Sequence, residues 1–314
     1  MLTGCQHQPT LNLTTSQTLE LSQTPFHDQT GFFCGPNALA TVLYRTGLDL
    51  DPDELARQVY LPGRQGSLQL ELVAATRSMQ RLAVAVEPAL QGIVQELELG
   101  FPVLILQNLG VAWLPVWHYA VVIGFDATQQ AFILRSGRHK RQLFPAHRLL
   151  KTWKRADHWG IVVLNPGELP ANPDVHAYTK SVAALEQVGQ FQAALAGYQA
   201  GMKRWPDNPT LQYGKANTLH QLGDSVGAIR IYRSLVQDHP EYWFATNNLA
   251  HTLALMGCKD LALKAIQDYQ ERSPKSFPPV LQQTRAAIAA QPDVRSAQRE
   301  CAVPDIHPVP AVHP

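Results

Sequence analysis

The chain has 314 residues and a formal net charge of +1, and 45% of its residues are hydrophobic. This length indicates about two domains, and the apolar fraction is sufficient for ordinary cores. The near-zero charge gives no support for a nucleic-acid-binding protein, and the longest apolar runs are strand-sized, far short of the ~20 residues that a membrane-spanning helix requires.

The first residues, Leu2-Thr3-Gly4-Cys5, resemble a bacterial lipobox, in which the cysteine is lipidated and becomes the mature N-terminus. The basic and apolar segments of a signal peptide are missing before it, so a chance match of four residues is the alternative. We interpret residues 1–24 as a lipobox-like start and a polar tether rich in Thr and Gln. The membrane would then be contacted only through a lipid on Cys5, in the bacterial cell envelope facing the periplasm; otherwise the protein is soluble.

Helices are expected first in the segment 25–168. Residues 34–46 should form a buried helix that ends at Gly47. The next helix is predicted over 51–60, with Asp51 as N-cap and Pro52 at the first helical position. Two further helices are expected near residues 68–80 and over residues 88–99.

Short apolar runs bounded by turn residues then predict strands at 82–86, 103–106, 118–124, 131–134 and 160–164. Helices followed by strands of an antiparallel-looking sheet are typical of an α+β domain. A Pro-rich stretch follows this domain, and residues 169–174 are interpreted as a linker.

The C-terminal half repeats with a period of 34 residues. Glycine, proline and alanine each recur at this interval, at Gly189, Gly223 and Gly257, at Pro206, Pro240 and Pro274, and at Ala194, Ala228 and Ala262. Glycine between two apolar-periodic segments and a late proline resemble tetratricopeptide repeats. The resemblance implies an all-α solenoid of three repeats (175–208, 209–242 and 243–276), which a helix at 279–290 would cap, so that the module spans 175–290.

Residues 291–314 contain several prolines and are expected to form a disordered tail. The cysteines lie at positions 5, 34, 258 and 301 without a C-x-x-C pair, a spacing that indicates neither a zinc site nor a disulfide framework. We interpret Cys258 as a small packing residue and Cys301 as an exposed residue of the tail. No metal and no organic cofactor are expected.

Cys34 opens its predicted helix, where the positive end of the backbone dipole favours thiolate, the nucleophilic form. His118, on a predicted strand, is a candidate base. Taken alone, a buried structural cysteine and a core histidine are the alternatives. Trp113 and Trp117 flank the histidine, and two interpretations of them stay open, walls of a peptide groove or core packing.

Three features occur in order along the chain: Gln29, then Cys34-Gly35-Pro36 opening a helix, then the strand HYAVVIG from His118. Together they resemble the double-glycine-peptidase-like branch of papain-fold cysteine peptidases. The resemblance covers about residues 23–166 and implies that residues 25–168 form a papain-like catalytic domain. It implies that Cys34 is the nucleophile, that His118 is the base, and that the Gln29 amide and the Cys34 backbone N–H hold the oxyanion. It further implies that a Cys–His ion pair lowers the pKa of the thiol.

The chain departs from the family at two points. Gln29 lies five residues before Cys34, where many relatives have six, and Asp28 is rejected as an oxyanion donor because its charge would repel the oxyanion. No carboxylate stands where relatives orient the histidine. A hairpin turning near residues 127–128 would place residues 136–138 opposite His118, so Ser136 or a backbone carbonyl is the expected orienter.

The sequence therefore predicts an envelope-tethered cysteine peptidase that cleaves peptide bonds through a thioester and docks a protein partner or its peptide substrate through the repeats. Two alternatives stay open. One is a non-catalytic peptide-binding protein with a decayed peptidase domain, and the other is acyl transfer from the same thioester to an amine.

Overall fold

The computed structural model describes residues 13, 17–28, 33–273, 277–292 and 301. The chain divides into two compact units, Met1–Gln190 and Phe191–Pro314, and each is described by itself. The division falls between the two helices of the first expected repeat.

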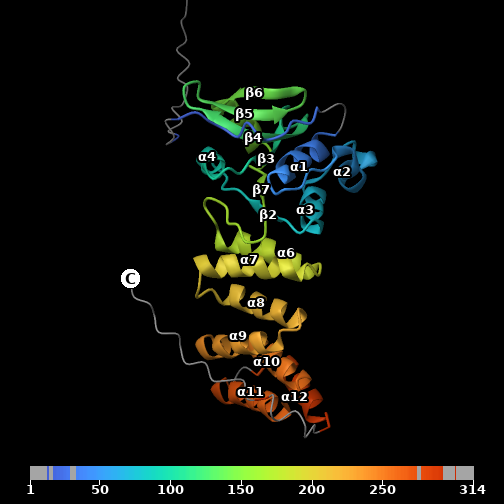
Figure 1. Ribbon diagram of the computed structural model, residues 1–314, viewed down its shortest axis with the longest axis vertical. Coiled ribbons are helices and arrows are strands. Elements are labelled where there is room, and N and C mark those ends of the chain that lie inside the picture. Colours follow the sequence, from blue (N-terminus) through green and yellow to red (C-terminus); the bar gives the residue numbers. More distant parts are fainter. Residues whose placement is uncertain (1–12, 14–16, 29–32, 274–276, 293–300, 302–314) are drawn as a thin grey trace, which may run out of the picture. The chain divides into compact units, whose positions relative to one another are not determined.

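A seven-stranded antiparallel sheet forms the centre of the first unit (Figure 1). The strand order is β2-β7-β3-β4-β5-β6, and β1 pairs with the far part of β4. The strands are β1 (Leu19–Glu20), β2 (Leu82–Ala85), β3 (Val103–Asn108), β4 (Trp117–Asp126), β5 (Ala131–Ser136), β6 (His139–Pro145) and β7 (Gly160–Leu164). Gly124 lets β1 approach, because a Cβ at this position would lie 2.3 Å from the Leu19 carbonyl oxygen.

Around the sheet lie α1 (Cys34–Tyr44), α2 (Pro52–Val59), α3 (Gln69–Ser78), α4 (Leu90–Glu98), α5 (Ala146–Lys154) and α6 (Val175–Gln187). Helices α1 to α3 gather on one side of the sheet and α4 lies on the other (Figure 1). The Asp51 side chain caps α2 by accepting from the Asp53 N–H, as predicted.

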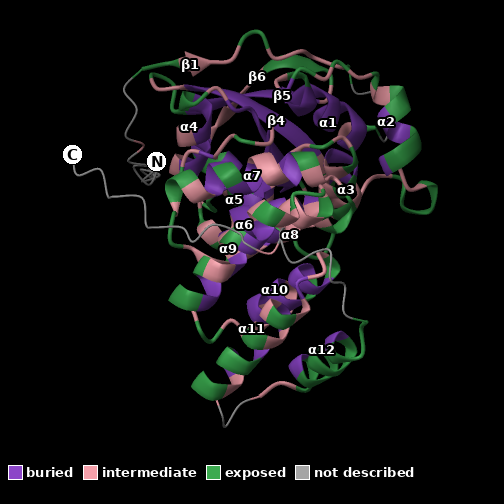
Figure 2. Cartoon of the chain, turned by 60° about the horizontal axis from the view of Figure 1, so that its bottom comes forward, coloured by how far each residue is buried: buried purple, intermediate pink, exposed green. Residues whose placement is uncertain are grey.

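The main core of this unit lies between α1 and the sheet. Every residue of α1 from Gly35 to Leu43 is buried, and Tyr119, Val121 and Ile123 of β4 pack into the same cluster. Figure 2 shows α1 and the central strands as the buried part of this unit. A helix that is apolar on all sides is stable only when it is enclosed, so this core fixes the position of the α1 N-terminus.

Three of the strands and α-helices of this unit were not predicted, and the first, β1, lies within the segment 1–24 that was interpreted as a tether. Strand β6 begins with three exposed residues, His139, Lys140 and Arg141, and such a charged edge lacks the alternating pattern of a half-buried strand. Helix α5 follows at once, and its Leu149 and Trp153 are fully buried. The five predicted strands are all present.

Helix pairs form the second unit, which contains α7 (Phe191–Arg204), α8 (Pro209–Gln221), α9 (Ser225–Asp238), α10 (Trp243–Leu255), α11 (Lys259–Arg272) and α12 (Pro279–Ala289). The 34-residue period is visible in these helices. Gly223 and Gly257 end α8 and α10 with φ values of 88° and 78°, which glycine adopts without strain. Ala216 and Ala250 are fully buried at equivalent positions.

A disulfide joins Cys258 and Cys301. Cys258 does pack in the core of this unit, but the expectation that the cysteines form no disulfide is wrong, and Cys301 is half-buried rather than exposed. Spacing could not reveal the bond, because it joins the start of α11 to a residue 43 positions later, and only the fold brings the two together. In the described part of the chain, no helix combines the length and apolarity that crossing a bilayer takes.

Candidate active site

Cys34 is the first residue of α1 and is half-buried. No side chain caps this end of the helix, so the N–H groups of its first turn remain available to other acceptors. The backbone N–H groups of Tyr119, Gly35 and Cys34 act on the sulfur in the direction that lowers the pKa of its thiol. Tyr119 directly follows His118 on β4, so the sulfur and the imidazole belong to the same end of this strand.

His118 is the second residue of β4, and its Nε2 lies 2.9 Å from the hydroxyl oxygen of Ser136 at the end of β5. Ser136 is buried. If its oxygen accepts from Nε2–H, the basic nitrogen of the neutral imidazole is Nδ1. The β4–β5 pairing, with a bulge between Val122 and Gly124, sets this juxtaposition, close to the register that the sequence predicted.

The two side chains line one cavity of about 610 Å³. One wall comes from residues 64–69, which lead from the connection after α2 into the first residue of α3. The other comes from the strand ends, with Leu106, Trp117 and Gly137. The cavity thus combines a thiol and an imidazole with polar and apolar wall residues. A thiol and an imidazole in one open cavity are the groups that acyl transfer requires.

Burial sets the ionisation of both groups. It raises the pKa of the Cys34 thiol, although three backbone N–H groups partly oppose the effect, and it lowers the pKa of His118. Both shifts favour a neutral thiol beside a neutral imidazole. The expectation that an ion pair lowers the pKa of this thiol is therefore wrong for the unliganded site, because desolvation outweighs the helix-terminal N–H groups.

Two predicted residues lie outside the described part of the chain, Gln29 and Cys5. The segment before Gln29 is nevertheless placed, because the buried Asn37 side chain of α1 donates to the Asp28 carbonyl at 2.9 Å. The proposed oxyanion role of Gln29 and the proposed lipidation of Cys5 remain predictions.

Tyr119 and Ser67 are residues that sequence reasoning missed. Besides its backbone contact with the sulfur, Tyr119 donates from its hydroxyl to the Ser67 carbonyl at 3.2 Å. The Ser67 hydroxyl lines the cavity, is buried and has no hydrogen-bond partner among the described residues. The only sequence signal for Tyr119 was its place next to His118, and Ser67 had none.

The open question about the two tryptophans has a partial answer. Trp113 is 83% exposed and Trp117 is 54% exposed, so neither is a core residue. Trp117 lines the cavity, whereas Trp113 does not belong to its lining.

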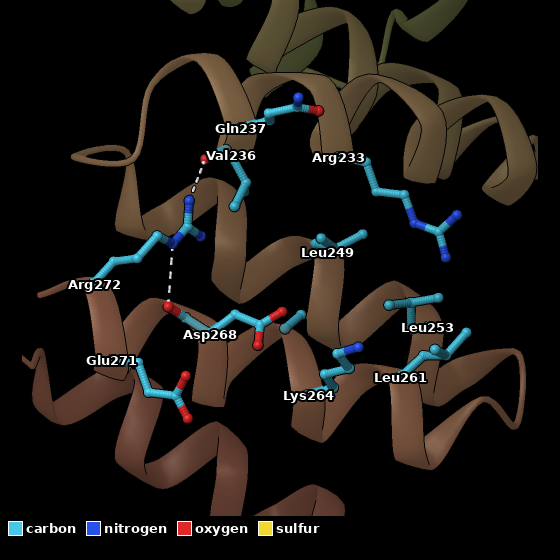
Figure 3. A pocket seen from close by; sticks show the side chains of 11 residues that line it. Arg233, Val236, Gln237, Leu249, Leu253, Leu261, Lys264, Asp268, Glu271 and Arg272 are labelled. Carbon is cyan, nitrogen blue, oxygen red and sulfur yellow. Dashed lines mark hydrogen bonds between the residues drawn. The ribbon is translucent and has the colours of Figure 1, made fainter. Parts of the chain in front are cut away.

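A second hollow lies in the helical unit, between α9, α10 and α11 (Figure 3). Leu249, Leu253 and Leu261 form its apolar part, with Arg233 and Asp268 among the charges around it. The residues that line it include no Ser, Thr, Cys or His. It therefore offers a surface for binding but none of the hydroxyl, thiol or imidazole groups of a hydrolytic site.

Among solved structures, the chain is similar to a C39-like peptidase from Bacillus anthracis, with 17% identity and a TM-score of 0.40 over 47% of this chain and 98% of the other. It is also similar to a tetratricopeptide repeat protein from Parabacteroides merdae, with 22% identity and a TM-score of 0.34 over 38% of this chain and 46% of the other. The chain thus spans less than half the length of the repeat protein. Both parts of the resemblance drawn from the sequence have a counterpart among these structures, but no family model and no curated protein matches the chain.

Proposed function

We propose that the chain is a cysteine peptidase whose papain-like domain, residues 25–168, cleaves peptide bonds through a thioester. The observation that carries this proposal is the shared cavity, which Cys34 and His118 both line, with the His118 imidazole 2.9 Å from the Ser136 hydroxyl. A structural cysteine has no need of an open cavity or of an oriented imidazole beside it.

The reaction begins from the neutral pair. As the substrate enters, the Cys34 thiol passes its proton to Nδ1 of His118 and the sulfur attacks the carbonyl carbon. The Cys34 N–H and the Gln29 amide stabilise the oxyanion, and a donor of this kind typically contributes on the order of 10²–10³ in rate. The imidazolium protonates the leaving amine, and water then hydrolyses the thioester with His118 as the base.

The test compares the wild type with Cys34→Ala, both in a Cys5→Ala background, using a peptide library and a thiol-directed epoxide. Cys258 and Cys301 are bonded to each other, so Cys34 is then the only thiol that the epoxide can alkylate. We expect library cleavage and a single labelled residue in the wild type and neither in the variant. Equal cleavage by both proteins, with no label on either, refutes the proposal.

The helical unit is proposed to dock a protein partner or the substrate, as a tetratricopeptide solenoid spanning 175–290 with its linker at 169–174. The hollow between α9, α10 and α11 supports this role, because an apolar floor with charges of both signs around it suits a polypeptide ligand (Figure 3). Arg233→Glu should weaken capture of peptides retained by the Cys34→Ala protein, whereas Lys215→Glu on α8 should not.

The cell envelope is the proposed location, with a lipid on Cys5 as the anchor. The Cys258–Cys301 disulfide supports an oxidising compartment. Mass spectrometry of the membrane-fraction protein should find an acylated Cys5 as the first residue. A free N-terminus that still begins at Met1 contradicts this location.

One observation favours a second candidate, a non-catalytic peptide-binding protein. Burial raises the pKa of Cys34 and lowers that of His118, as in a site that no longer activates its thiol. The pH dependence of thiol alkylation separates the candidates. If the Cys34 thiol is alkylated only when the pH exceeds about 8.5, the ordinary pKa of a thiol, with or without bound peptide, the result favours the binding protein. Product mass spectrometry with added amines separates hydrolysis from acyl transfer.

A further inference from the structure

Residues 109–117 connect β3 to β4 as an exposed apolar hairpin, whose sequence is LGVAWLPVW. Its large exposed side chains are Leu109, Val111, Trp113, Leu114, Val116 and Trp117. Single exposed apolar residues are common on protein surfaces, but a contiguous group marks an interaction site. Trp113 at its tip is the most exposed large hydrophobic side chain among the described residues, at 83%.

The hairpin is an ordered structure. Leu109 N–H donates to the Val116 carbonyl at 2.8 Å, and Val111 and Leu114 exchange two backbone bonds of 3.2 Å. The Asn108 side chain accepts from the N–H groups of Gly110 and Val116, both at 3.0 Å. The apolar residues are therefore presented by a fixed backbone.

Helix α5 places positive charge beside the base of this hairpin. Its Thr152 hydroxyl accepts from Gln107 at 2.7 Å, and Arg155, which follows the helix, donates to the Gly110 carbonyl. Arg148 and Lys151 lie on the same helix face as these two residues, at spacings of three and four, and both are exposed. Among the described residues, neither forms an ion pair, and Asp157 is the nearest acid along the chain.

We propose that this hairpin and the cationic face of α5 form a docking site for an anionic membrane surface. Tryptophan and aliphatic side chains enter the boundary between headgroups and acyl chains, and neighbouring cations attract anionic headgroups. A peptide substrate explains the surface less well, because Val111, Trp113 and Leu114 do not line the cavity of Cys34 and His118. Docking would hold that cavity near the bilayer through Trp117, which belongs both to the hairpin and to the cavity wall.

The test uses the full chain with Cys5→Ala, so that no lipid can be attached, and vesicles of phosphatidylethanolamine mixed with phosphatidylglycerol. We expect the protein to co-sediment with these vesicles, to dissociate at high salt, and not to bind vesicles of phosphatidylcholine alone. The double variant Trp113→Ala/Leu114→Ala should bind at least about tenfold more weakly. Lys151→Ala should bind roughly fivefold more weakly at low salt.

Leu70→Ala is the matched control, because Leu70 is 70% exposed on α3 and should leave binding unchanged. All variants should unfold at the wild-type temperature. Absence of wild-type binding, or equal binding by the hairpin variant, overturns the proposal. So does a hairpin variant that keeps vesicle binding but raises KM for a soluble peptide, because the surface would then serve the substrate. The binding assay needs no peptidase activity, so its outcome is independent of the proposed function.

Discussion

Replacing Ser136 with alanine tests whether the proposed base is positioned by a hydroxyl rather than by a carboxylate. The Ser136 oxygen lies 2.9 Å from Nε2 of His118, and the serine is buried. The substitution removes this acceptor and fills no new space. In the free enzyme a neutral imidazole loses an ordinary hydrogen bond, but during the reaction an imidazolium loses a charge-assisted one.

The size of the effect follows from that difference. A hydrogen bond to a charged group contributes about 1.5–3 kcal/mol, against about 0.5–1.5 kcal/mol for a neutral pair. Only the difference between the two contributions, about 1–1.5 kcal/mol, appears in kcat/KM, which should therefore fall about 5- to 13-fold. The loss should be mainly in kcat, because Ser136 does not line the substrate cavity.

A fluorogenic peptide taken from the library hits, assayed across pH, provides the measurement. Losing the acceptor lowers the pKa of His118 further, so the acidic limb of the kcat/KM profile should move to lower pH by about one unit. Ser136→Asn, which keeps an acceptor oxygen, should restore much of the rate. Ser78→Ala on α3 is the control for an exposed serine that bonds only its own helix.

A Ser136→Ala enzyme that keeps kcat/KM within about twofold of the wild type and shows an unmoved acidic limb would refute this reasoning. His118 would then be oriented by another group, or would not be the base. A loss of rate with an unmoved limb and a lowered melting temperature would assign Ser136 a structural role only.

Three further predictions concern stability. Burial raises the pKa of Glu96 to about 7. The contribution of this group to the free energy of unfolding is therefore fully present below its ordinary pKa of about 4.5, and up to about 3 kcal/mol is lost as pH rises through 7. Glu96→Gln, which still accepts from the Ala171 N–H, should remove that slope in urea titrations at about pH 5 and about pH 8. Cys258→Ser removes the disulfide to Cys301, whose sequence separation of 43 corresponds to about 4 kcal/mol of chain entropy in the unfolded state. Thermal unfolding without reductant should show this loss of stability. Adding reductant should lower the melting temperature of the wild type only. Gly124→Ala brings a methyl group to 2.3 Å from the β1 backbone, so it should cost about 1–3 kcal/mol and release β1 to limited proteolysis; wild-type resistance in this variant contradicts the pairing.

The repeats could be predicted best, because their constraints are local. A glycine such as Gly223 must adopt a positive φ, and an alanine such as Ala228 must be small wherever two helices cross. Each requirement recurs every 34 residues along the chain. The placement of Ser136 opposite His118 could also be predicted, because the register of a hairpin follows from counting residues back from its turn.

The unpredicted features depend on contacts that are distant in sequence. The charges at the start of β6 obscured a strand that pairs with β5 through its backbone. The pKa directions at Cys34 and His118 depend on how deeply the fold encloses them, which a helix-terminus argument cannot supply. Trp113 resembles a core residue by type, and only the hairpin geometry exposes it.

The bond between Cys258 and Cys301 also governs how the protein responds to being cut. A protease that cleaves once anywhere between those two positions leaves the pieces covalently joined, so the break is visible only after reduction. Proteolytic trimming of the C-terminal end would therefore remove the residues beyond Cys301 and retain the connection to α11. A reporter fused behind Cys301 would stay attached to the last helix pair through such a nick and would separate once a thiol reductant is added.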